Sequence, residues 1–298
     1  MDDTTDTTPP EWFHTALSSP PRRGVTVVEG CEIVHHTWGE PAGPRTPPVI
    51  LVHGRGAHGL WWSHLAPFLS AGHAVVALDL SGHGDSGRRD AYDIAQWTRE
   101  ITAVAADVSA VPPILVGHSM GGTVCLTIAA GRGIALTGIA AIDSPIGVPH
   151  GRRPTGAGST RRATAPAAYA SREELLTRFR LVPDDPWALG YLVEHVAALT
   201  ARETQRGWAW KTDPAALVPV LVTPEELGPA ACPAALVRTE HGLATLETTA
   251  AIARRLGVDV RTAEIPAAGH HVLLDQPLAV VSVLRMLLAD WAGPGPST

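Results

Sequence analysis

The sequence predicts an α/β fold with a mostly parallel central sheet and helices on both of its faces. Short apolar runs, typical of strands buried on both sides, alternate with longer segments of helical periodicity. This alternation extends over most of the 298 residues, and it is the order in which parallel sheets are built. One apolar run also leads directly into a glycine-rich turn, Gly117-His118-Ser119-Met120-Gly121, that opens a helical segment.

Composition and charge exclude several classes of protein. The chain is 45% hydrophobic with a net charge of −6, and it contains no apolar run of membrane-spanning length. A dispersed negative charge argues against binding to nucleic acid. The first residues are acidic and polar, whereas a secretory signal has a basic start and an apolar stretch. We therefore expect a cytoplasmic protein that binds neither nucleic acid nor a membrane; no feature predicts its oligomeric state.

Residues 1–22 are expected to form an N-terminal arm. This segment is rich in Thr, Pro and Asp and is expected to be loose at its start. Trp12, Phe13 and Leu17 are out of place in a solvated tail, so we expect them to dock onto the body of the protein.

The core of the fold is expected in residues 23–146 and 230–298. Apolar and β-rich runs predict strands at residues 25–29, 32–37, 49–52, 74–78, 114–116, 138–142, 234–238 and 259–265. Helical patterns predict helices at residues 93–108, 121–130, 244–256 and 278–291.

Residues 147–229 interrupt the alternation after the sixth strand and predict an inserted helical cap. The segment opens with a Gly-, Pro- and Arg-rich loop at 149–164 and continues with helical patterns at 172–180 and 187–204. Its aromatic residues are expected to form mainly the core of the cap, with one or two lining a largely apolar substrate pocket. The candidates for that pocket are Trp187, Tyr191, Trp208 and Trp210.

Ser119 is the candidate nucleophile. A Gly-x-Ser-x-Gly turn between a strand and a helix forces strained dihedral angles on the serine, so its flanking positions must be small. The turn presents the hydroxyl at a helix N-terminus, where developing negative charge is stabilised. Two backbone N–H groups are expected to form an oxyanion hole: Met120 after the nucleophile, and Arg55 in the loop after residues 49–52. His53 is expected to brace that loop.

His270 is the candidate base, because it follows Gly269 in a loop after the last predicted strand. An imidazole titrates near neutrality, so it can accept the serine proton and return it to a leaving group. His271 is expected to face elsewhere. Together with Asp275 these histidines have metal-ligand chemistry, but no second cluster accompanies them, so we predict neither a metal nor another cofactor.

The histidine needs a carboxylate on its other ring nitrogen, and two candidates follow predicted strands. Asp143 comes after residues 138–142, and Glu240 comes after residues 234–238. Both positions reach the same edge of a parallel sheet, so topology alone leaves the choice open.

From Val49 to Asp143 and from Pro233 to Trp291, the chain resembles cap-containing α/β-hydrolases of the bacterial esterase and lipase type. The resemblance rests on His53-Gly54, Asp79-Leu80-Ser81-Gly82-His83-Gly84-Asp85-Ser86, Gly117–Gly122 and Gly269-His270. It implies the α/β-hydrolase fold. In that family the acid often ends a Gly-x-x-Asp pattern, which here falls on Thr239 and Gly242, so the usual aspartate is absent. Relatives without it place the acid at the position of Asp143, with Glu240 as the alternative here.

The resemblance also indicates a reaction. Epoxide hydrolases and haloalkane dehalogenases of this fold have an aspartate at the nucleophile position, whereas this chain has Ser119. A serine there implies an acyl-enzyme and hydrolysis of a carboxylic ester, thioester or lactone. Carbon–carbon bond hydrolysis or cofactor-free lyase chemistry on the same residues is the alternative. A non-catalytic ligand-binding protein on this scaffold is a further one.

Overall fold

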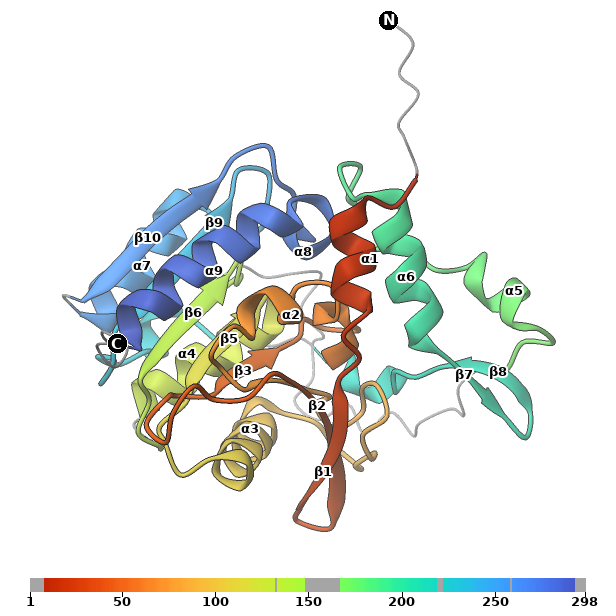
Figure 1. Cartoon of the computed structure of the whole chain (residues 1–298), viewed down its shortest axis with the longest axis horizontal. Helices are drawn as coiled ribbons and strands as arrows, with labels where there is room; N and C mark the ends of the chain where they lie inside the picture. Colours follow the sequence, from red (N-terminus) through yellow and green to blue (C-terminus); the bar gives the residue numbers. More distant parts are fainter. Residues whose placement is uncertain (1–7, 132, 148–166, 219–221, 258, 293–298) are drawn as a thin grey trace, which may run out of the picture.

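An eight-stranded sheet lies at the centre of the structure, a computed structural model that describes residues 8–131, 133–147, 167–218, 222–257 and 259–292 (Figure 1). The strand order is β1-β2-β4-β3-β5-β6-β9-β10. β2 runs antiparallel to β1 and β4, and all other neighbours pair in parallel, which confirms the predicted sheet. The strands are β1 Arg22–Val28, β2 Cys31–Trp38, β3 Val49–Val52, β4 Val75–Leu78, β5 Ile114–His118, β6 Gly138–Ile142, β9 Ala234–Thr239 and β10 Val260–Ile265.

Helices cover both faces of the sheet, and successive residues of its central strands face opposite layers. Ile50 and Val52 of β3 pack in the layer of α3, α4 and α7, whereas Val49 and Leu51 pack in the layer of α2 and α9. The helices are α1 Glu11–Leu17, α2 Ala66–Leu69, α3 Ile94–Val108, α4 Met120–Gly131, α5 Arg172–Leu176, α6 Gly190–Thr200, α7 Leu246–Leu256, α8 Val272–Asp275 and α9 Pro277–Trp291. None of these, within the described ranges, is long and apolar enough to cross a membrane.

Parallel pairing aligns the carboxyl ends of the central strands. Gly117 of β5 pairs with Val52 of β3 and with Ala141 of β6, and Ile142 pairs with Val237 of β9. The loops that follow these four strands therefore meet at one edge of the sheet, where open α/β folds place their ligands.

The start of the N-terminal arm, which was expected to be loose, falls largely on residues 1–7, outside the described residues. From residue 11 the arm forms the helix α1, which lies beside α6 (Figure 1). Phe13 is only 5% exposed, and its ring centre lies 5.2 Å from that of Tyr191 and 5.3 Å from that of His195. Trp12 and Leu17 pack against the same cluster, so the predicted docking occurs. The composition of this segment does not predict the helix, because the helix is stabilised by contacts with α6, which is far away in the sequence.

The segment between β6 and β9 contains a hairpin as well as helices. The single helix predicted over residues 187–204 begins at Gly190 and ends at Thr200, and β7 Ala201–Thr204 then pairs with β8 Gly207–Trp210. The hairpin is stabilised by a pairing that local periodicity does not contain: Tyr169 and Trp208 exchange backbone hydrogen bonds of 2.8 and 2.9 Å. The loop predicted at 149–164 lies outside the described residues.

Replacing Phe13 with Ala is expected to lower the free energy of unfolding by about 3 kcal/mol, because the change leaves a cavity between α1 and α6. Urea denaturation measures this. Thr15→Ala, at an exposed position of the same helix, is the matched control and should stay within about 0.5 kcal/mol of wild type. A loss for Phe13→Ala no larger than that of the control would mean that α1 does not pack on α6 in solution.

Candidate active site

Ser119 stands in a tight turn between β5 and α4. Its φ is +53°, in the left-handed region, and its amide donates a 2.9 Å hydrogen bond to the carbonyl of Ile142. A β-carbon at Gly121 would meet the Val52 carbonyl and lie 2.6 Å from that of His53; one at Gly117 would lie 2.5 Å from the Gly121 carbonyl. Only glycine fits at these two positions, so the residue pattern around Ser119 follows from backbone packing.

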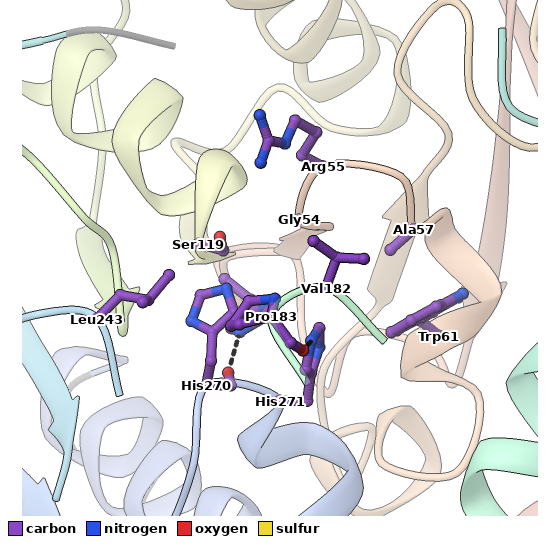
Figure 2. Close-up of a pocket in the computed structure, with 11 residues that line it drawn as sticks. Gly54, Arg55, Ala57, Trp61, Ser119, Val182, Pro183, Leu243, His270 and His271 are labelled. Atoms are coloured by element: carbon purple, nitrogen blue, oxygen red, sulfur yellow. Dashed lines mark hydrogen bonds between the residues drawn. The ribbon is translucent and has the colours of Figure 1, made fainter. Parts of the chain in front are cut away.

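Ser119 lines a cavity of about 360 Å³ (Figure 2). A second cavity of about 270 Å³ adjoins it and shares Arg55, Trp61, Val182 and His271. The first cavity is lined by Gly54, Arg55, Ala57, Trp61, His118, Ser119, Val182, Pro183, Leu243, His270 and His271. The wall of this space is therefore largely apolar, with the serine and three histidines as its reactive groups.

His270 is hydrogen-bonded to Asp143. The imidazole Nδ1–H donates to Asp143 Oδ2 over 2.6 Å, and the carboxylate also accepts from the amides of Leu243 (2.9 Å) and Ala244 (2.8 Å). Burial by itself would raise the pKa of Asp143, but the hydrogen bonds from His270 and the two amides hold that pKa below its ordinary value. The carboxylate is thus ionised and fixes the ring so that Nε2 is free of Asp143.

Glu240, the other candidate acid, has a different place. Its side chain is exposed, and its carboxylate accepts a 2.8 Å hydrogen bond from the Ala267 amide. It therefore supports the loop that precedes His270 and is not the partner of the imidazole.

Gly242 occupies the position where the resembling family has its usual aspartate. A β-carbon there would meet the hydroxyl of Thr239 and the carboxylate of Asp143, whose Cγ would lie 2.5 Å away. The Asp143 carboxylate thus fills the space that a side chain at position 242 would need.

The two expected oxyanion donors lie on either side of Ser119. A β-carbon at Gly54 would lie 3.3 Å from Ser119 Cβ, so the loop that contains Arg55 passes close to the serine. Within the described part of the chain, the amides of Arg55 and Met120 donate to no protein group. The Arg55 side chain lines the same cavity as Ser119 (Figure 2).

His53 is buried beneath this loop, where the sequence predicted a brace. Its Nδ1–H donates to the Gly54 carbonyl over 2.7 Å, and its Nε2 accepts from the Leu80 amide over 3.1 Å. Burial holds the pKa of His53 well below its ordinary value, so the ring is neutral and both nitrogens are occupied.

The other two histidines of the cavity are neutral hydrogen-bond donors. His118 Nε2–H donates to the His270 carbonyl over 2.7 Å, and burial, with the neighbouring His270, holds the pKa of His118 below its ordinary range. His271 Nε2–H donates to the Pro183 carbonyl over 3.0 Å, and burial lowers the pKa of His271 to about 4. The sequence expected His271 to face elsewhere, but its ring lines the cavity. His118 was not predicted to have a role.

The four aromatic residues proposed for the pocket are absent from the lining of either cavity. Trp187 stacks on His241 with ring centres 4.7 Å apart, and Tyr191 packs on Phe13. Trp208 lies under the guanidinium of Arg172, and Trp210 lies beside Phe179. Contacts outside the cavity account for all four side chains. Trp61, which follows the oxyanion loop closely in sequence, is the aromatic residue of the cavity wall.

The chain is similar in sequence to two mycobacterial lipases. Lipase LipV of Mycobacterium tuberculosis is 27% identical over 265 residues, which cover 83% of this chain and 95% of that protein. A monoacylglycerol lipase of Mycolicibacterium smegmatis is 39% identical over 102 residues, or 32% of this chain. The match to this monoacylglycerol lipase spans only 36% of its length, and a match to the dihydrolipoyllysine-residue acetyltransferase component of the acetoin cleaving system of Pseudomonas putida spans only 25%.

Family and structure comparisons extend over more of the chain. The model of the Alpha/beta hydrolase family matches residues 49–283. A thioesterase domain from the curacin biosynthetic pathway superposes with a TM-score of 0.73 at 20% identity, covering 89% of this chain and 99% of that domain. At this identity the likeness is one of fold. The resemblance expected from the motifs is confirmed.

Gly242→Ala is expected to lower the free energy of unfolding by about 1–3 kcal/mol, because its β-carbon overlaps the Asp143 carboxylate. Displacing Asp143 should also remove the downfield proton NMR signal of a His270 Nδ1–H bonded to a carboxylate. Gly131→Ala is the matched control, since a β-carbon at the end of α4 meets nothing within 4 Å. If both variants match the wild type in urea denaturation and in this signal, the described packing of Asp143 against Gly242 is wrong.

Proposed function

The chain belongs to the alpha/beta hydrolase family, and we propose that it is a serine hydrolase that cleaves a carboxylic ester, thioester or lactone. One observation supports this above the others. His270, which lines the same cavity as Ser119, donates its Nδ1–H to the buried, ionised Asp143. This pairing leaves Nε2 as the basic nitrogen and stabilises the imidazolium that forms when it takes a proton.

In the proposed reaction Ser119 attacks the carbonyl carbon of the substrate while its hydroxyl proton passes to His270 Nε2. The oxygen of the tetrahedral intermediate accepts hydrogen bonds from the amides of Arg55 and Met120. The bond to the alcohol or thiol then breaks, and His270 returns the proton to this leaving group. A water molecule, deprotonated by the same nitrogen, attacks the acyl-enzyme and releases the acid and free Ser119.

We also propose that residues 147–229 act as a cap over this site. Val182 and Pro183 from this segment line the cavity opposite the core residues. With Trp61 and Leu243 they give an apolar wall, which supports a small-molecule substrate with an apolar group next to the reacting carbonyl. The lipase names of the relatives are consistent with such a substrate.

A fluorophosphonate probe is expected to label the protein at Ser119, and Ser119→Ala should abolish both labelling and hydrolysis of p-nitrophenyl esters. Ser63→Ala is a matched control, because Ser63 Oγ is hydrogen-bonded to a histidine, His195 Nε2, over 2.8 Å. That pair lies outside the cavity lining, so the control should react like the wild type. A wild-type protein that neither reacts with the probe nor cleaves any ester would refute the hydrolase proposal and favour a binding protein.

Asp143→Asn is expected to lower kcat by about 10⁴-fold, because an amide neither selects the required tautomer nor stabilises the imidazolium. Glu240→Gln should stay within about 3-fold of wild type, since a side-chain amide oxygen still accepts from Ala267. Steady-state kinetics on one p-nitrophenyl ester compares the two. The opposite ranking would assign the acid to Glu240.

A further inference from the structure

Two buried carboxylates bind the backbone on either side of His270. Asp275 Oδ2 accepts from the Gly269 amide over 2.5 Å, and Asp185 Oδ2 accepts from the His271 amide over 2.9 Å. The two aspartates are only 5% and 7% exposed. They come from different parts of the chain, because Asp275 ends α8 in the core whereas Asp185 belongs to the insertion, residues 147–229.

These contacts complete a set that surrounds the base. The carbonyl of His270 accepts from His118, and its ring donates to Asp143. Among the described residues, four side chains bind residues 269–271, and three of them belong to the core. Asp185 is the fourth and comes from the insertion.

The fit of Asp185 to this loop is close. A β-carbon at Gly269 would lie 2.5 Å from Asp185 Oδ2, so the carboxylate lies directly against the glycine that precedes the base. Its other oxygen accepts from the Trp187 amide over 3.2 Å, which fixes the carboxylate on its own segment.

The arrangement costs free energy, because both carboxylates are buried without an ion-pair partner among the described residues. Burial, with the neighbouring Asp185, raises the pKa of Asp275 to about 6.

The segment that contains Asp185 also forms the wall of the cavity. Val182 and Pro183 line it, and the Pro183 carbonyl accepts the hydrogen bond from His271 Nε2. Residues 182–185 therefore contact both the space for the substrate and the residue that follows the base.

We propose that Asp185 is a positioning residue through which the insertion holds His270 in place against Ser119. Its carboxylate fixes the His271 amide, and that amide sets the backbone from which the imidazole projects. A substrate seated against Val182 and Pro183 thus acts on the same segment that positions the base. This inference rests on the proposed hydrolase function.

Asp185→Ala tests it. The variant is expected to lower kcat on a p-nitrophenyl ester about 10- to 100-fold, because small displacements of a base are costly. KM should change less than about 3-fold, because Val182 and Pro183 remain in the wall. The rate of fluorophosphonate labelling of Ser119 should fall in parallel with kcat. Asp185→Asn keeps an oxygen that accepts from His271 and should recover most of the rate.

Asp184→Ala, at the exposed neighbouring position, is the matched control and should behave as wild type. If Asp185→Ala does not fold, Asp185→Ser takes its place, since its hydroxyl falls short of the His271 amide. A raised KM with unchanged kcat and labelling rate would make Asp185 a structural residue of the insertion and overturn the proposal. Absence of labelling in the wild type would instead refute the hydrolase function.

Discussion

The close packing of the backbone around Ser119 is the constraint on which the rest of the site depends. The turn after β5 lies so near the end of β3 that Gly121 has room for no side chain. The same proximity brings the Gly54–Arg55 loop to the serine, and the Ser119 amide is bound by the last residue of β6. Three neighbouring parallel strands thus lead into Ser119, the Arg55 loop and Asp143, which we propose as nucleophile, oxyanion donor and acid. The site is formed where the carboxyl ends of these strands meet at one edge of the sheet.

The limited space beside His270 supports Asp143 as the proposed acid. The ends of β6 and β9 are adjacent, and a β-carbon at position 242 would overlap the Asp143 carboxylate. Asp143 fills that volume because Gly242 has no side chain, and the left-handed backbone at Asp143 directs its carboxylate there. The lack of an aspartate at the end of the Gly-x-x-Asp pattern therefore leaves room for the carboxylate of Asp143. Glu240 is also acidic, but its side chain is exposed to solvent.

Trp61 connects the packing of α1 on the insertion with the cavity. Its side chain belongs to the cluster formed by Phe13 of α1 and by Leu192 and Val196 of α6, and it also lines the cavity. Among the aromatic residues of the insertion, Phe179 and Tyr191 pack against this cluster, whereas Trp187 stacks on His241. The contact between the insertion and the reacting groups comes from the short segment 182–185.

Local patterns in the sequence determined the elements whose stability is local. The apolar runs of β3 and β6 match their predicted bounds, and α3 begins where Asp93 caps it by accepting from the Gln96 amide. Ser119 and His270 were proposed because the glycines beside them complete short motifs that can be read within a few residues, although Gly121 packs against His53 and Gly269 against Asp185. The tertiary structure supports Asp143, which the family resemblance also favoured, over Glu240 as the proposed acid. It places Trp61, Val182 and Pro183 in the cavity wall instead of the four proposed aromatic residues, and it brings Asp185 to the loop of His270. Each of these depends on contacts between segments far apart in the chain, and hydrophobic periodicity contains no information about them.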